Sequence, residues 1–295
     1  MMAEIPSRLP FWKMHGAGND FVVAETDRLD VTDEQWGALA QRVCDRHFGV
    51  GADGLILVQP SAVADRKMRI FNADGSDGVM CVNGIRCFVK FSFDRGLVSA
   101  PDGAMAVETG PGVVSCVASF ASDGTVERVR VAVAVPDLRP AAVGVAIEQA
   151  PPVTSMPVTT KDAQGDSTQH VAIVSMGNPH AIQFIDGSPD DYALHRIGPL
   201  MEHHPVFQYR TNYEVARVLD RKTIEMRVWE RGVGETLACG SGACAVMVAA
   251  QILGQVDHAV DVRLPGGVLR IDWPGEGEVV LTGPAAKVFE SEWAQ

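Results

Sequence analysis

Two short segments of the chain repeat one pattern, and each leads into an apolar stretch of helical length. NADGSDGVMCVNGIRC at 72–87 and GETLACGSGACA at 234–245 place Cys81 and Cys239 in equivalent positions. A glycine-containing turn precedes each cysteine, and residues 85–93 and 243–253 are largely apolar around the helix, as in a fully buried helix. The repeat therefore predicts two similar halves, each with a thiol at the N-terminus of a buried helix.

A thiol in that position has distinctive chemistry. The unpaired N–H groups and the dipole of the helix favour the thiolate, which lowers the pKa of the thiol. The same N–H groups bind a carboxylate or a phosphate. An anion held between two such helix ends would have Cys81 on one side and Cys239 on the other. One thiol could then remove a proton from one face of a carbon while the other returned a proton to the opposite face.

Length and charge narrow the class of protein. With 295 residues the chain can form two domains, each with its own core. A balance of 25 basic against 37 acidic residues, net −12, argues against nucleic acid or an anionic membrane as the main partner. A small polar substrate is compatible with this charge. The sequence has no signal-peptide pattern and no apolar run of membrane-spanning length, so we expect a cytoplasmic protein with reduced cysteines.

Hydrophobic patterning predicts many strands around these two helices. A helix begins after Thr32, which suits an N-cap, and strands are expected at 11–24, 54–58, 126–135, 172–176, 181–185, 214–219 and 224–230. A hairpin around Gly266-Gly267 joins strands 260–264 and 268–273. We therefore expect an α+β protein in which each half is a curved, mostly antiparallel sheet wrapped around a central helix. The expected domains are 1–134, completed by 283–295, and 135–282.

Other interpretations of the cysteines are open at this point. Both could be plain buried cysteines, which most cysteines are. A zinc site could use Cys81, Cys87, Cys239 and Cys244, although structural zinc sites favour cysteines two to four residues apart. The Cys-x-x-Cys pattern of a thiol oxidoreductase is missing from the sequence, and a cysteine hydrolase would need only one such thiol. We expect no metal site.

Polar residues next to predicted strands supply further candidates. Asn19 follows KMHGAG, Asn178 and His180 lie in GNPHAIQF, Asn212 lies in RTNYEVARV, and Glu230-Arg231 precede the second thiol. Each alone is typical of a turn, a structural histidine or a solvated surface pair. Together, several amides and one arginine at strand ends could enclose a zwitterion, because arginine binds a carboxylate in bidentate fashion while amides orient an ammonium.

These residues resemble those of a known family, the diaminopimelate epimerases, over the whole chain. The resemblance rests on HGAGNDF, GVGADG, NADGS, NGIRC, GNPH, the Asn of RTNYE, WERG and ACGSGACA, in family order. It implies a pyridoxal-phosphate-independent epimerase with two pseudo-symmetric domains. Such an enzyme interconverts LL- and meso-2,6-diaminopimelate for lysine and peptidoglycan synthesis. No cofactor is implied, and a homodimer is one assembly that we keep open.

The resemblance also implies roles for individual residues. Cys81 and Cys239 are the expected catalytic pair, with His180 and Glu230 beside them. The expected substrate contacts are Asn19, Asn72, Val82, Asn83, Gly84, Asn178, Asn212, Glu230, Arg231, Gly240 and Ser241. The family usually has glycine where this chain has Val82.

The substrate's far end should decide specificity. Arg231 is expected to hold the distal carboxylate, because Arg86 should point into its own helix. The alternative within the same chemistry is a racemase of another amino acid, such as proline or histidine. A proline-specific enzyme would have no use for these distal contacts.

Overall fold

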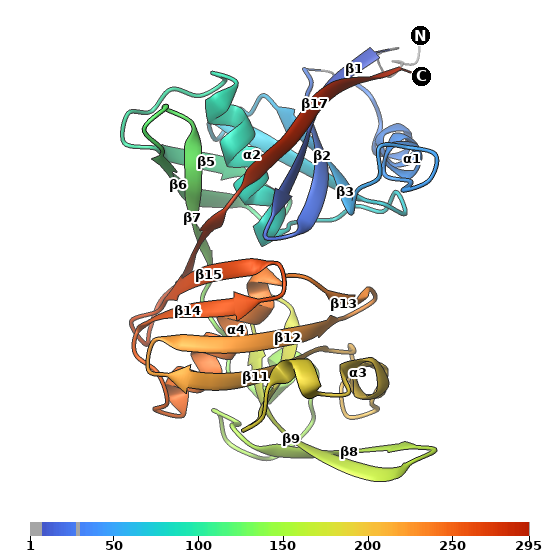
Figure 1. The fold of residues 1–295 in the computed structure, drawn as a ribbon, viewed down its shortest axis with the longest axis vertical. Coiled ribbons are helices and arrows are strands. Elements are labelled where there is room, and N and C mark those ends of the chain that lie inside the picture. The colour runs from blue at the N-terminus through green and yellow to red at the C-terminus, as the bar shows by residue number, and fades with distance from the viewer. Residues whose placement is uncertain (1–7, 28–29, 295) are drawn as a thin grey trace. The chain divides into compact units, whose positions relative to one another are not determined.

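The chain forms two compact units in the computed structural model, which describes residues 8–27 and 30–294 (Figure 1). Unit 1 comprises Met1–Val131 and Thr282–Gln295, and unit 2 comprises Ala132–Leu281. The chain passes from unit 1 to unit 2 within β7 (Val126–Ala134) and returns within β16 (Val279–Pro284). Unit 2 is therefore an insertion into unit 1.

Unit 1 is a mixed sheet with two helices. The sheet runs in the order β17-β1-β2-β3-β4-β5-β6-β7, in which only β2–β3 and β4–β5 are parallel pairs. Its other elements are β1 (Arg8–Gly16), β2 (Asn19–Glu25), α1 (Asp33–Val43), β3 (Gly54–Gln59), β4 (Arg66–Asn72), α2 (Val82–Asp94), β5 (Ala104–Glu108), β6 (Val113–Phe120) and β17 (Ala286–Ala294).

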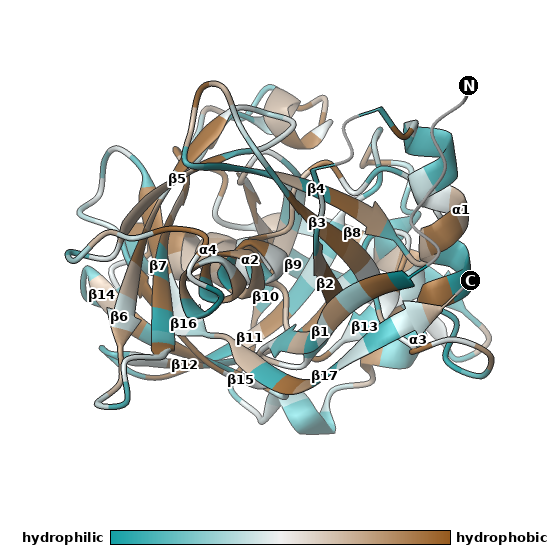
Figure 2. Ribbon diagram, turned by 90° about the horizontal axis from the view of Figure 1, so that it is seen from above, coloured by the Kyte–Doolittle hydropathy of each residue, from teal (hydrophilic) through white to brown (hydrophobic). Residues whose placement is uncertain are grey.

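Both faces of β2 and β3 are buried, each under a different helix. Phe21 and Ile56 belong to the core that α2 fills, whereas Val22 and Leu55 pack on the side of α1. This alternation follows from the two-residue period of a strand. It explains why residues 54–58 are apolar without interruption, and Figure 2 shows β3 brown along much of its length. Thr32 caps α1, as predicted, in a capping box with Gln35.

One expected strand is a hairpin. Residues 11–24 were expected to be extended throughout, but β1 and β2 pair antiparallel across Ala17 and Gly18. Both turn residues have positive φ, 55° and 87°, which is the backbone of a type I′ turn. Alanine is unusual at such a position, although the neighbouring Gly18 and Asn19 are typical of a turn. Its effect is to place Asn19 at the start of β2.

Unit 2 is a second mixed sheet. Its main order is β8-β9-β10-β11-β12-β14-β15, with β13 on β12 and parallel pairs at β10–β11 and β12–β14. The strands are β8 (Met156–Asp162), β9 (Gly165–Ser175), β10 (Pro179–Phe184), β11 (Asn212–Asp220), β12 (Thr223–Glu230), β13 (Gly234–Thr236), β14 (Ala259–Leu264) and β15 (Gly267–Asp272). The hairpin loop between β14 and β15 is Pro265-Gly266, one residue earlier than expected.

Unit 2 also has one central and one outer α-helix. α4 (Gly240–Ile252) is buried on nearly every side and contacts the strands from β9 to β12 as well as β14 and β15. α3 (Leu194–Glu202) packs against β8, β11, β12 and β13, and it was not predicted. Two short 3₁₀ helices are η1 (Pro140–Val143) and η2 (Pro189–Asp191). The α+β prediction, with a mostly antiparallel sheet around a central helix in each unit, is confirmed.

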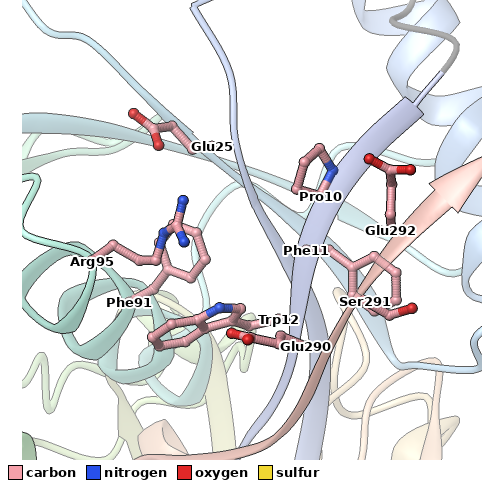
Figure 3. Close-up of a pocket in the computed structure, with 9 residues that line it drawn as sticks. All are labelled: Pro10, Phe11, Trp12, Glu25, Phe91, Arg95, Glu290, Ser291 and Glu292. Atoms are coloured by element: carbon pink, nitrogen blue, oxygen red, sulfur yellow. The ribbon is translucent and has the colours of Figure 1, made fainter.

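A groove of about 520 Å³ lies beside β1 and β17 in unit 1 (Figure 3). Trp12 and Phe91 form its apolar part, and Arg95 and Glu290 lie among its polar residues. None of the residues that line it belongs to the predicted site. The helices of residues 8–27 and 30–294 fall short of the length and apolar character that a membrane-spanning helix requires.

Candidate functional site

Cys81 is the N-cap residue of α2, as the repeat predicted. Its backbone is extended, with φ −136° and ψ 121°, and its sulfur accepts a hydrogen bond from Gly84 N at 3.5 Å. The N–H groups of Val82 and Asn83, the first two residues of the helix, point out of its N-terminal end. The first thiol therefore lies at an anion-binding helix terminus.

Asn19 joins the first thiol to the turn before β2. The Cys81 thiol donates to Asn19 Oδ1 at 3.5 Å, and Asn83 Nδ2 donates to the same oxygen at 3.3 Å. Asn19 Nδ2 in turn donates to Asp53 Oδ2 at 2.6 Å. Asn19 and Asn83, which were predicted separately, are therefore brought together beside Cys81.

Asn19 is followed by a charged cluster, which was not predicted and which consists of Lys13, Asp20, Arg46 and Asp53. Asp20 pairs with Lys13 and with Arg46, and Arg46 also reaches Asp53 Oδ1 at 2.7 Å. Burial opposes ionisation of Asp20, but hydrogen bonds from Arg46 and Lys13 outweigh it and lower the pKa of Asp20 to about 2. The cluster fixes Asp53 and, through it, the amide of Asn19.

The other predicted residues of unit 1 lie on β4 and α2. Asn72 ends β4 and donates to Ser76 Oγ at 2.9 Å. Val82 is buried and is the first residue of α2, where the backbone is helical, so the left-handed conformation that would require glycine is not used here. Gly84 packs so closely on β3 that an added Cβ would lie 3.0 Å from Ile56 Cδ1. Arg86 donates to Val82 O within its own helix, as expected.

Cys239 caps α4 with nearly the same geometry. Its backbone has φ −117° and ψ 112°, and Gly242 N donates to the sulfur at 3.4 Å. The Ser241 hydroxyl lies 3.5 Å from the sulfur, and Gly240 is the first residue of the helix. The prediction that both thiols lie at helix N-termini is therefore confirmed.

The prediction that the helix N-terminus lowers the pKa of the thiol is wrong for Cys239. Burial raises the pKa of this thiol well above its usual value, and the negative charges of Glu230 and Glu214 raise it further. The hydrogen bonds from Ser241 and Gly242 act in the opposite direction but are outweighed. Cys239 is 5% exposed. Desolvation therefore favours the neutral thiol here more than the helix terminus favours the thiolate.

Glu230 is a candidate base for this thiol. It ends β12, accepts a hydrogen bond from the Thr236 hydroxyl and lies within hydrogen-bond reach of Cys239. Burial raises the pKa of Glu230, although the bonds to Thr236 and Cys239 lower it in part. A carboxyl with a raised pKa next to a thiol can exchange a proton with it.

His180 belongs to a buried polar chain that ends at Cys239. Its Nδ1 lies 2.6 Å from Glu214 Oε1 and its Nε2 lies 3.0 Å from Asn178 Oδ1. Asn178 Nδ2 then donates to Ser241 Oγ at 3.3 Å. Glu214 was not predicted, although an acid inside the apolar strand NYEVA was a usable signal because a fully buried carboxylate needs a partner.

Asn212 and Arg231 meet at the end of β12. Asn212 is buried, donates to Pro179 O at 2.8 Å and accepts from Arg231 N at 2.9 Å. The exposed guanidinium of Arg231 donates to Tyr209 O at 3.1 Å. Asn212 thus fixes the backbone from which the arginine extends.

Glu202, also missed, supports the same segment from α3. One carboxylate oxygen accepts from Trp229 Nε1 at 2.8 Å, and the other accepts from Gly232 N at 2.9 Å. These two bonds bracket Glu230 and Arg231. The α3 helix therefore has a positioning role, since it holds the segment that carries both predicted residues.

All six cysteines lie in the described part of the chain, and none forms a disulfide. Cys87 and Cys244 lie inside α2 and α4 and are fully buried. Burial raises the pKa of Cys87 to about 12. Among residues 8–27 and 30–294, no group of three or more His, Cys, Asp or Glu side chains is arranged to hold a metal ion.

Comparison with known proteins gives one family. The family model described as diaminopimelate epimerase matches residues 11–116 and 172–288. The diaminopimelate epimerase of Desulforudis audaxviator is 46% identical over 97% of this chain and 100% of its own length, and that of Acetivibrio thermocellus is 44% identical over 96% and 97%. A phenazine biosynthesis protein of the PhzF family from Bacillus anthracis has the same fold, with a TM-score of 0.69 at 16% identity over 97% of this chain and 99% of that one.

Proposed function

The chain belongs to the diaminopimelate epimerase family, and we propose that it interconverts LL- and meso-2,6-diaminopimelate with two cysteines as its proton carriers. The observation that carries this mechanism is the repeated cap: Cys81 on α2 and Cys239 on α4 each accept a hydrogen bond from the N–H three residues later. An epimerase that inverts a carbon needs one proton carrier for each face, and the chain supplies two thiols at equivalent helix caps.

The α-proton of an amino acid is a very weak acid, so the enzyme must stabilise the carbanion that forms when it leaves. In the proposed mechanism the α-carboxylate binds at the N-termini of α2 and α4. Negative charge develops on that carboxylate as the proton is removed, and the helix N–H groups stabilise it most in the transition state. One cysteine acts as the thiolate base and the other as the thiol acid. Their protonation states are exchanged in the reverse direction.

Cys239 requires help to act as a base because its pKa is raised. We propose that Glu230 accepts its proton, while the Ser241 hydroxyl and Gly242 N donate to the resulting thiolate. The contacts that support this are the 3.5 Å and 3.4 Å distances from sulfur to these two donors. Burial raises the pKa of Glu230, which makes its carboxylate a stronger proton acceptor.

We propose that the remaining predicted residues bind the distal end of the substrate. Arg231 would hold the distal carboxylate, with Asn72, Asn178 and Asn212 contributing amide groups. The exposure of the Arg231 guanidinium and the anchoring of its backbone on Asn212 support this role. We also propose that the enzyme works in the cytoplasm, where its thiols stay reduced. The homodimer remains a prediction that light scattering can test.

Incubation of the purified protein with LL-diaminopimelate in D₂O tests the function. We expect meso-diaminopimelate carrying deuterium at the inverted α-carbon, without added cofactor. Proline, tested in parallel, should not exchange its α-proton for deuterium. If proline incorporated deuterium and diaminopimelate did not, the chain would be a racemase of a different amino acid.

A further inference from the structure

Asp53 is a charged residue to which the mechanism above gives no role, although it contacts a predicted site residue. It lies directly before β3, and its side chain is 43% exposed. Its main chain is fixed at both ends, because Asp53 N donates to Asp20 O at 2.9 Å and Asp53 O accepts from Ala73 N at 3.1 Å. A carboxylate held in this way can fix the orientation of the groups that donate to it.

Asp53 contacts the first two residues of β2, whose side chains point to opposite faces of the sheet. Asn19 lies on the side of Cys81, and Asp20 lies on the side of Arg46. Asp53 Oδ2 accepts from Asn19 Nδ2 at 2.6 Å and from Asp20 N at 3.1 Å, while Oδ1 pairs with Arg46 at 2.7 Å. The carboxylate therefore links the ion pairs on one face to the amide beside the thiol on the other.

This contact decides which way the Asn19 amide points. Asp53 pairs with Arg46 as a carboxylate, and a carboxylate can only accept hydrogen bonds. The amide atom 2.6 Å from it must therefore be the nitrogen. An amide turned by 180° would place its oxygen against the carboxylate, and two acceptors repel each other. Asn19 Oδ1 consequently faces the Cys81 sulfur, at 3.5 Å.

An amide oxygen beside a thiol favours the protonated form. Asn19 Oδ1 accepts the S–H hydrogen of Cys81 and would repel the negative sulfur of a thiolate. Gly84 N has the opposite effect, because it donates to the sulfur. An amide that was free to turn could donate to the sulfur as well, and both of these contacts would then favour the thiolate. The orientation of Asn19 thus influences the protonation of Cys81.

We propose that Asp53 is a positioning residue for Cys81: it holds the nitrogen of Asn19, keeps the amide oxygen on the sulfur and so favours the thiol, the form that acts as the acid. This inference rests on the proposed role of Cys81 as a proton carrier. Asp53 acts through one intervening side chain. The role agrees with the mechanism proposed above, in which Glu230 accepts the proton of Cys239.

Two variants separate the orientation of the amide from the charge of Asp53, whose loss alone would also favour the thiolate. Asp53→Asn removes the charge but keeps an oxygen to which Asn19 Nδ2 and Asp20 N can both still donate. Arg46 keeps its pair with Asp20 in this variant. Asp53→Ala removes the charge and the acceptor together.

The measurement is the rate at which iodoacetamide, which reacts with the thiolate, modifies Cys81 at one fixed pH, followed by peptide mapping. Cys239, in unit 2, is the internal control. Asp77→Asn is the matched control variant, because Asp77 lies four positions before Cys81 and pairs with Arg69. The reaction needs no diaminopimelate, so its outcome is independent of the proposed substrate.

We expect Cys81 to be modified about tenfold faster in Asp53→Ala than in the parent, the scale of one hydrogen bond to an ionised group. In Asp53→Asn and Asp77→Asn the rate should stay close to that of the parent, and the rate at Cys239 should not change. Equal acceleration in Asp53→Ala and Asp53→Asn would mean that only the charge matters and would overturn the proposal. An unchanged rate in Asp53→Ala would overturn it as well.

A double-mutant cycle tests whether the effect passes through Asn19. Asn19→Ala should by itself speed the modification of Cys81, and the addition of Asp53→Ala should cause no further change. Further acceleration in the double variant would show that Asp53 acts on the thiol by another route and would contradict the proposal. Asn19→Ala also serves if Asp53→Ala does not fold, because a rate no faster than that of the parent would refute the role given to the amide oxygen.

Discussion

The carboxylate of Asp20 lies 2.8 Å from Arg46 Nη2, and the same carboxylate pairs with the buried amine of Lys13. Because Asp20 follows Asn19, this cluster lies directly behind the amide that contacts the first thiol. The same contacts that hold Asp20 ionised thus also hold one wall of the site.

Asp20→Asn should destabilise the protein in a pH-dependent way. The pKa of Asp20 is lowered from 3.8 to about 2 on folding, so its ionisation stabilises the fold above pH 3.8 and this stabilisation is lost as the pH falls through 2. Each pKa unit corresponds to about 1.4 kcal/mol, which gives roughly 2 kcal/mol near neutral pH. Urea unfolding at pH 7 and at acidic pH measures this. If the difference in unfolding free energy between Asp20→Asn and the parent did not shrink on acidification, the effect of the substitution would be steric.

Cys81→Ala and Cys239→Ala should each abolish epimerisation and leave the fold intact, because each removes one of two required proton carriers. Substitution by serine at either position should also cause a severe loss of activity, since a hydroxyl is far harder to ionise than a thiol. Circular dichroism monitors the fold, and Cys116→Ala, another buried cysteine outside the predicted site, is the matched control. Near-normal turnover in either active-site variant would refute the two-base mechanism.

Oxidation should inactivate the enzyme reversibly. If both thiols act on one carbon, they must approach closely in the working enzyme, and an oxidant should join them in a disulfide. A reductant should restore activity. Peptide mapping of the inactive protein checks this, because inactive protein in which Cys81 and Cys239 are both still reduced would show that they do not meet.

Arg231→Lys should weaken transition-state binding of diaminopimelate by about 1–3 kcal/mol, since lysine keeps the charge but loses the bidentate fork. The comparison substrate is lysine, which lacks the distal carboxylate and should be poor with both proteins. Values of kcat/KM for the two substrates measure the effect. Equal proportional losses would mean that Arg231 supports the fold rather than specificity.

The helices that carry the thiols could be predicted from the sequence, whereas several of their neighbours could not. The caps at Cys81 and Cys239 followed from a repeated local pattern. In contrast, α3 has Ala193 as its N-cap residue, without a side-chain hydrogen bond to the helix, and contains Pro199, so it lacked the usual signals of a helix. Local patterns carry no information on which distant residues meet.

The pairing of Glu214 with His180 illustrates this limit. The two residues are 34 positions apart and meet because β10 and β11 are parallel neighbours. The raised pKa of Cys239 was missed for a similar reason, since it comes from burial and from charges on β11 and β12. The position of the thiol was a local property, but its acidity was not.

The pairing of β17 with β1 joins two segments that are far apart in the sequence. Strand β1 is Arg8–Gly16 and its partner β17 is Ala286–Ala294, and the whole of unit 2, Ala132–Leu281, lies between them. Bringing the two strands together closes a very long loop, and the entropy that this costs grows with the length of flexible chain in the loop. We therefore expect unit 2 to fold before β17 pairs with β1, because a folded unit 2 shortens that loop.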